Sequence, residues 1–136
     1  MAKSVRPAYR KQADLPLEEP KNTDKRKPTF CLEFLKKGFD VKNPDMTKEA
    51  KAAFAERLQE LASMSWSEIK QQGRHAQGFE LIKVGQLAIS LPETFEGSET
   101  VMAFRYHGRH PMVGIRAGAT LHILAIEREF DELYKH

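Results

Sequence analysis

The chain has 136 residues, 40% of them apolar, which suits one domain with a single hydrophobic core. Lysine and arginine total 22 against 19 acidic residues, and this net charge of +3 permits a polyanionic partner without requiring one. The single cysteine, Cys31, excludes an internal disulfide and a cysteine metal cluster, and no apolar stretch reaches the roughly 20 residues that span a membrane.

Residues 1–28 are rich in lysine, arginine, proline and acidic residues and show no apolar periodicity. Such a segment cannot bury enough surface to offset its ordering entropy. We therefore predict a basic, polar arm, followed by a single domain over residues 29–136. The arm also lacks the apolar core of a secretory signal, so we expect a cytoplasmic protein with no membrane partner.

The domain opens with a predicted strand and a predicted helix. Residues 29–34 alternate between apolar and polar, which directs Phe30, Leu32 and Phe34 to one face of a sheet. Thr47 is the expected N-cap of the helix. The apolar residues of this helix then recur at helical spacing: Ala50, Phe54, Leu58 and Leu61.

A second helix and several strands are predicted next. The segment Ser65-Trp-Ser-Glu68 matches a capping box and indicates a short helix that ends near Gln72. Residues 79–82 and 87–91 are expected to form short strands. Three more alternating runs follow, joined by tight links: 101–107, 112–116 and 120–127. They predict an antiparallel three-stranded meander.

This order of elements predicts an α+β fold, in which an antiparallel sheet carries one or two helices on one face as a two-layer sandwich. The apolar helix face would pack on one side of the sheet. The other side would then remain free to carry polar and basic groups, and we expect the functional residues there.

Arg105 and Arg116 lie within otherwise apolar strands of the meander. Cations there must face solvent, an acidic partner or an anionic ligand, because burying them unpaired is too costly. If residues 108–111 form a hairpin, the two arginines can share a face and hold a phosphate with their planar guanidinium groups. The alternative, which the sequence alone favours somewhat, is two surface arginines paired with nearby carboxylates: Glu80, Glu127 or Glu129.

Imidazole and phenol groups suited to proton transfer cluster late in the chain. His107 and His110 flank the turn and His122 lies inside a strand, although such residues also serve as exposed turn or core histidines. No zinc-binding motif accompanies them. Tyr134 and His136 could stack on a base and donate a proton, or could simply anchor and end the tail.

Several further basic side chains could steer RNA toward the sheet, although a solvated surface explains them equally: Arg74, His75, Lys83, His107 and Arg109. The sequence has no nucleotide-binding glycine loop, nucleophile elbow or paired-carboxylate motif. This weighs against a metabolic enzyme with a large cofactor, and we expect neither a cofactor nor a metal.

The C-terminal part resembles the RelE/ParE-like toxin superfamily, over roughly the last 35 to 60 residues. The resemblance depends on the order of residue types in four segments: Phe104-Arg-Tyr106, Val113-Gly-Ile-Arg116, His122-Ile-Leu-Ala-Ile126 and Leu133-Tyr134. It implies a microbial-ribonuclease-like α+β domain that cleaves RNA without metal, typically mRNA on the ribosome. It also implies a cognate antitoxin as partner.

The resemblance further implies catalytic roles by residue type. Arg105 and Arg116 would stabilise charge on the scissile phosphate. Tyr134 or His136 would protonate the leaving 5′ oxygen, and a carboxylate such as Glu80 would accept the proton of the 2′-hydroxyl. The nucleophile would be the RNA's own 2′-hydroxyl.

Two other functions remain open at this point. One is a non-catalytic module of phage or plasmid origin that uses the same basic face to bind RNA or a protein. The other is a structural or regulatory protein whose arm docks on a partner. Some branches of the superfamily act on DNA gyrase and lack the catalytic residues, so the fold alone does not decide between these functions.

Overall fold

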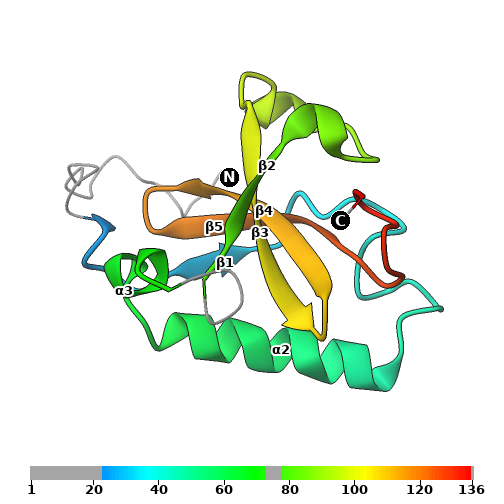
Figure 1. Cartoon of the computed structure of the whole chain (residues 1–136), viewed down its shortest axis with the longest axis horizontal. Helices are drawn as coiled ribbons and strands as arrows, with labels where there is room; N and C mark the ends of the chain where they lie inside the picture. Colours follow the sequence, from blue (N-terminus) through cyan, green and yellow to red (C-terminus); the bar gives the residue numbers. More distant parts are fainter. Residues whose placement is uncertain (1–22, 73–77, 136) are drawn as a thin grey trace, which may run out of the picture.

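The computed structural model describes residues 23–72 and 78–135. These residues form an α+β fold with a five-stranded sheet and two α-helices, in agreement with the predicted class (Figure 1). The strands are β1 (Thr29–Cys31), β2 (Glu80–Lys83), β3 (Thr100–His107), β4 (His110–Ala117) and β5 (Thr120–Ile126). The helices are α2 (Lys48–Ala62) and α3 (Trp66–Lys70).

The sheet has the order β1-β5-β4-β3-β2. Strands β3, β4 and β5 form the predicted antiparallel meander, and β2 pairs antiparallel with β3. The predicted antiparallel pairing is confirmed for β2 to β5, but the sheet as a whole is mixed, because β1 pairs parallel to β5, with Thr29 opposite Thr120. Alternation with period two reveals that a strand has two faces but carries no information about the direction of its neighbour.

Two predicted strands differ from the structure. β1 ends at Cys31, after which the backbone turns and Leu32 keeps 44% of its surface exposed. Residues 87–91 are not a strand; they follow a short 3₁₀ turn at Val84–Gln86 and contribute buried Ile89 to the core. Their alternation reflects a loop that lays apolar side chains on the sheet without ladder hydrogen bonds.

Both predicted helix starts are confirmed. The Thr47 hydroxyl accepts a hydrogen bond from the Ala50 amide at 3.0 Å, as an N-cap does. At α3 the Ser65 hydroxyl accepts from the Glu68 amide at 3.1 Å, and the Glu68 carboxylate accepts from the Ser65 amide at 2.8 Å. This reciprocal capping box fixes a helix of only five residues, which propensity alone would not hold.

The sheet is covered on both faces. On one face α2 and α3 pack through Phe54, Leu61 and Trp66 onto the central strands. On the other face the 84–99 segment and the C-terminal tail bury Ile89 and Leu133 over β3, β4 and β5. Figure 1 shows α2 along one side of the sheet and the 84–99 segment away from it. The expectation that one sheet face stays open is therefore wrong.

The second covered face follows from composition. β3, β4 and β5 carry apolar side chains on both faces, so leaving one face in water would expose a large apolar surface. In the part of the chain that the structure describes, neither helix has the length and apolar character needed to cross a bilayer.

Candidate functional site

One cavity brings together several of the predicted site residues. It has a volume of about 330 Å³ and is lined by Glu80, Leu81, Ile82, Gln86, Arg105, Arg109, Tyr134 and Lys135. These residues come from β2, the turn after it, β3, the β3–β4 hairpin and the C-terminal tail. Glu80, Arg105 and Tyr134 belong to the predicted catalytic set, and Arg109 to the predicted RNA-binding set.

Strand register places the carboxylate and the guanidinium on the same side. Glu80 pairs with Ala103, and directly opposed residues of antiparallel strands point to the same face. Ala103 packs in the core on the face opposite the helices, and Arg105 lies two residues further along β3. Glu80 and Arg105 are thus diagonal neighbours on one face, at the edge where that core ends.

Arg57 of α2 supports the strand at Arg105. Its side chain is only 6% exposed, and its Nε donates a hydrogen bond of 2.7 Å to the carbonyl oxygen of Arg105. Burial lowers the pKa of Arg57, while the carboxylate of Glu60, 3.5 Å away, acts in the opposite direction. An arginine remains charged under such a shift, so this bond fixes the backbone from which the Arg105 side chain leaves.

The tail that carries Tyr134 is anchored through Leu133. The amide of Leu133 donates to Oε2 of Glu127 at 3.1 Å, and its carbonyl accepts from the Ala88 amide at 2.8 Å. Leu133 and Glu127 are both fully buried. The residue that precedes Tyr134 is therefore held on both sides, which sets where Tyr134 enters the cavity wall.

A second phenol stabilises the start of the same tail. The hydroxyl of Tyr106 donates to the carbonyl oxygen of Glu127 at 2.5 Å. Burial, together with the charges of Glu127 and Glu132, raises the pKa of Tyr106 to about 12. Tyr106 therefore stays protonated at neutral pH and keeps donating this bond. Nδ1 of His110 lies 3.4 Å from the carboxylate of Glu127 and adds a further polar neighbour.

Arg116 lies elsewhere. Its guanidinium contacts Asp24 at 2.6 Å, the Thr23 hydroxyl at 3.0 Å and the Gly118 carbonyl at 2.7 Å. It also lies over the Trp66 ring, 4.3 Å from the centroid. Hydrogen bonds from Lys70 and Arg116 lower the pKa of Asp24. From the sequence, ion pairing was the alternative role of Arg116. The carboxylate that pairs with it is that of Asp24, which precedes β1 and had been assigned to the arm.

The expectation that Arg105 and Arg116 share a face is wrong. A register shift between Arg105 and His107 sets Arg105 opposite Pro111, whereas His107 pairs with His110. Without this shift Arg105 would oppose Met112, and Arg116 would fall on the same face. One extra residue in a strand reverses the faces of all residues beyond it. Arg116 consequently packs against Trp66 on the helix side.

The remaining predicted residues do not line the cavity or lie outside the description. Lys83 pairs with Thr100 at the end of edge strand β2, one residue out of phase with Glu80 and Ile82. His107 lies beside His110, with their ring centroids 6.1 Å apart. Arg74, His75 and His136 fall outside the described residues.

The three histidines weighed as a zinc site do not gather. His122 lies against Phe34 and Phe95, with ring centroids 5.8 and 5.3 Å away, and burial lowers its pKa. The other two flank the β3–β4 turn. Over residues 23–72 and 78–135 no group of three or more potential metal ligands occurs.

Some residues at the site were missed in the sequence. Arg57 was not among the predicted core or site residues, yet it is buried. A signal was present, because Arg57 falls on the same helical stripe as Ala50, Phe54 and Leu61. Gln86 and Lys135 also line the cavity. Gln86 belongs to the turn after β2 and Lys135 to the C-terminal tail, and the position of such irregular segments cannot be predicted from hydrophobic periodicity.

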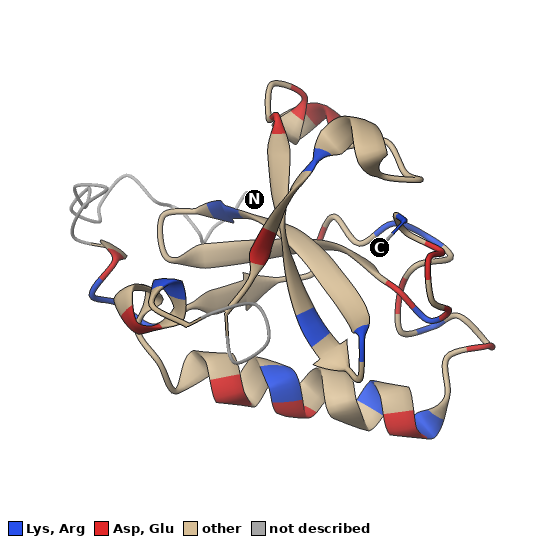
Figure 2. Ribbon diagram, in the orientation of Figure 1, with Lys and Arg blue, Asp and Glu red and all other residues tan. Residues whose placement is uncertain are grey.

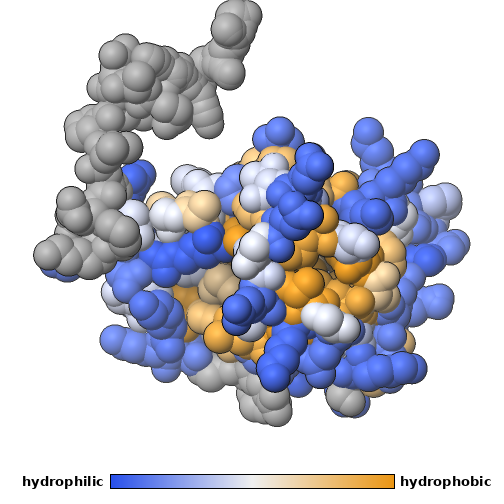
Figure 3. Space-filling view, turned by 90° about the horizontal axis from the view of Figure 1, so that it is seen from above, coloured by the Kyte–Doolittle hydropathy of each residue, from blue (hydrophilic) through white to orange (hydrophobic). Residues whose placement is uncertain are grey.

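Among the residues that the structure describes, acidic and basic side chains are interspersed rather than gathered on one face (Figure 2). Figure 2 shows acidic and basic residues side by side along α2 and in the segments around the sheet. Seen from above, apolar residues occupy the centre of the view and hydrophilic residues surround them (Figure 3). Basic character at the cavity is therefore local, supplied by Arg105, Arg109 and Lys135.

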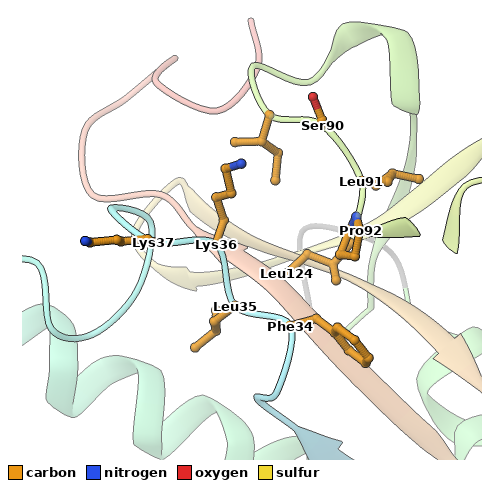
Figure 4. A pocket seen from close by; sticks show the side chains of 9 residues that line it. Phe34, Leu35, Lys36, Lys37, Ser90, Leu91, Pro92 and Leu124 are labelled. Atoms are coloured by element: carbon orange, nitrogen blue, oxygen red, sulfur yellow. The ribbon is translucent and has the colours of Figure 1, made fainter. Parts of the chain in front are cut away.

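A larger cavity lies under the residues that follow β1. It has a volume of about 400 Å³ and is bordered mainly by apolar side chains, including Phe34, Ile89 and Leu124. Figure 4 shows the side chain of Lys36 rising toward the level of Ser90, whereas Lys37 extends away from the other side chains. The residues that line this cavity include no carboxylate, arginine or phenol. Despite its larger volume, it is therefore not a candidate for a catalytic site.

Comparison with protein-family models, with curated proteins and with solved structures finds no match to this chain. The chemistry of the cavity is accordingly inferred from its own residues. Its combination of a carboxylate, two guanidinium groups, an ammonium group and a phenol suits a phosphodiester better than a neutral ligand.

Proposed function

We propose that the chain is a RelE-like endoribonuclease that cleaves RNA without a metal ion, and that the cavity at Arg105 is its active site. One observation carries the proposal: Glu80, Arg105, Arg109 and Tyr134 line the same cavity although they are up to 54 positions apart in the sequence. The three kinds of group that RNA transesterification needs, a base, a phosphate ligand and an acid, are represented there.

The roles follow from the chemistry of each side chain. The carboxylate of Glu80 accepts the proton of the 2′-hydroxyl, and the resulting oxygen attacks the phosphorus atom. Arg105 and Arg109 stabilise the negative charge that builds up on the phosphate oxygens. Tyr134 donates its proton to the leaving 5′ oxygen as the bond between phosphorus and that oxygen breaks. The products are a 2′,3′-cyclic phosphate and a 5′-hydroxyl.

Arg116 has no part in this proposal, because its guanidinium is engaged by Asp24 and Trp66 on the helix side of the sheet. Arg105 is instead assisted by Arg109 from the adjacent hairpin and by Lys135 from the tail. The ribosome as the place of cleavage and a cognate antitoxin as partner remain part of the proposal.

The test is a ribonuclease assay with RNA, with and without ribosomes, on wild type, Arg105→Ala and Glu80→Gln. We expect Arg105→Ala to lower the cleavage rate about 10²- to 10³-fold, as loss of one transition-state donor does. Glu80→Gln should lower it about 10²- to 10⁴-fold, because the amide cannot accept the proton.

Matched controls are Arg26→Ala and Glu93→Gln, which remove an exposed arginine and an exposed carboxylate away from the cavity. Both should cleave at the wild-type rate, and circular dichroism should show that all variants are folded. Intact RNA with wild type under every condition would contradict the proposal. RNA binding that needs Arg105 but yields no product would instead support the non-catalytic binding module.

A further inference from the structure

Beside the cavity an arginine and an aromatic ring are stacked at the surface. Arg109, at the tip of the β3–β4 hairpin, lines the cavity and is itself exposed. Its guanidinium carbon lies 4.6 Å from the centroid of the Phe130 ring. This distance is that of a cation–π contact, which holds the guanidinium above the ring. The cavity wall and the stacked pair therefore share a residue.

Phe130 keeps 43% of its surface exposed, one of three large apolar side chains so exposed among the described residues. Its position is nevertheless constrained. Asp131 has a left-handed backbone conformation with φ of 66°, which turns the chain from exposed Phe130 toward buried Leu133. Leu133 is held by the Glu127 carboxylate and by Ala88. The same short turn thus presents Phe130 outward and Tyr134 to the cavity.

A flat aromatic ring with a guanidinium beside a cavity lined by Arg105, Arg109 and Lys135 suits one particular ligand, a nucleotide whose base is not paired. Unstacked bases of single-stranded RNA bind to proteins by stacking on aromatic rings and on arginine planes. Every base offers such a face, so the contact selects unpaired RNA rather than a particular sequence. The bases of a duplex are already stacked on one another and cannot reach the pair.

We propose that Arg109 and Phe130 form a stacking subsite for one unpaired base of single-stranded RNA, next to the nucleotide whose phosphate occupies the cavity. This inference depends on the proposed function for the position of the phosphate. It adds the form of RNA that is recognised and assigns Phe130 a role in binding rather than in the chemical step.

The experiment measures binding without cleavage. The probe is a short single-stranded RNA with 2′-O-methyl riboses, which lack the attacking hydroxyl, and with 2-aminopurine placed at each position in turn. With wild type we expect quenching of the fluorescence at one position. Phe130→Ala should abolish that quenching and weaken binding roughly five- to 150-fold, the loss expected for one base–aromatic stack. Phe130→Trp should restore both.

Leu32→Ala is the matched control, because Leu32 is as exposed as Phe130 but belongs neither to the stacked pair nor to the cavity wall, and this variant should bind like wild type. Wild-type affinity and quenching in Phe130→Ala, or a duplex of the same sequence that competes as well as the single strand, would overturn the subsite. If Arg105→Ala abolishes binding and Phe130→Ala does not, the cavity stands and the stacking fails. Quenching without cleavage of natural RNA would refute the proposed enzyme and leave the subsite intact.

Discussion

Asp24 accepts hydrogen bonds from both Arg116 and Lys70, so three charged side chains converge beside Trp66 and the β4–β5 turn. The amide of Trp66 donates to the carbonyl of Arg26, and the amide of Ser67 donates to that of Asp24. Residues before β1 are thereby tied to α3. At this site Arg116 acts as a structural cation, because its donors point to protein oxygens rather than to the cavity.

The ion pairs of Asp24 should make stability depend on pH at the acid end. Because its folded-state pKa lies below the ordinary 3.8, this contribution is complete above that value and is lost as the pH falls through the folded-state pKa. Urea unfolding of Asp24→Asn should show lower stability than wild type at pH 7, with the difference narrowing below about pH 4. Glu93→Gln controls for the lost charge. A difference that is constant from pH 7 to pH 2 would contradict this assignment.

Single residues also show where sequence reasoning reached its limit. Arg105 was predicted as a phosphate ligand from its charge inside an apolar strand, and it does line the cavity. The prediction that Arg105 and Arg116 share a face was wrong because the register of β3 and β4 shifts by one residue between Arg105 and His107. No residue type in the sequence predicts such a bulge. Glu80 and Tyr134 were predicted from the need for a base and an acid. Glu80 lies near Arg105 because β2 pairs with β3, and Tyr134 lies there because the tail is anchored through Leu133.

At the scale of elements, the close approach of β4 to β5 depends on Gly114. The register shifts between Val113 and Gly114, and a Cβ built on Gly114 would lie 2.6 Å from the carbonyl oxygen of His122. Two central strands therefore approach more closely than any residue with a side chain permits. Gly85, in the turn after β2, has no atom within 4 Å of such a Cβ and offers the matched comparison.

We expect Gly114→Ala to destabilise the fold by about 1–3 kcal/mol, the usual cost of forcing extra volume into a packed core. Gly85→Ala should change the free energy of unfolding by less than about 1 kcal/mol, and in the stabilising direction if it restricts the unfolded chain. Urea denaturation followed by circular dichroism measures both. Equal stability of the two variants would show that β4 and β5 can separate without cost.

The elements themselves were largely predictable because their signals are local. Capping residues mark the starts of α2 and α3 within a few positions, and alternation marks β3, β4 and β5. The direction of β1 and the loop at residues 87–91 were not predictable, since both depend on a partner far away in the sequence. A segment with alternating apolar residues has the same sequence pattern whether it forms a strand of the sheet or a loop that packs on the sheet.

At the scale of the whole molecule, two apolar layers enclose one sheet. Trp66, the only tryptophan of the chain, is fully buried in the layer on the helix side. Leu133 is fully buried in the layer on the opposite side. β3, β4 and β5 contribute side chains to both layers, so neither layer can persist when these strands separate. Loss of packing on one face of the sheet should therefore also destabilise the packing on the other face.

Leu133→Ala should lower the stability by about 2–5 kcal/mol, because it removes a fully buried side chain. Although Leu133 is on the far face, the urea midpoint reported by Trp66 fluorescence should fall together with that reported by circular dichroism. Leu32→Ala, at an exposed position, should leave both midpoints close to wild type. A Trp66 midpoint unchanged by Leu133→Ala would mean that the two layers unfold independently.

The pairing of β1 with β5 joins Thr29 to Thr120, 91 positions later, through a hydrogen bond of 2.8 Å between their hydroxyls. On the ribosome the earlier strand leaves the exit tunnel long before its neighbour has been synthesised. The sheet can then close only after β5 has left the tunnel, and the growing polypeptide keeps its apolar strands accessible to chaperones until that moment. A chain released before β5 has been synthesised would be an aggregation-prone fragment rather than a smaller folded protein.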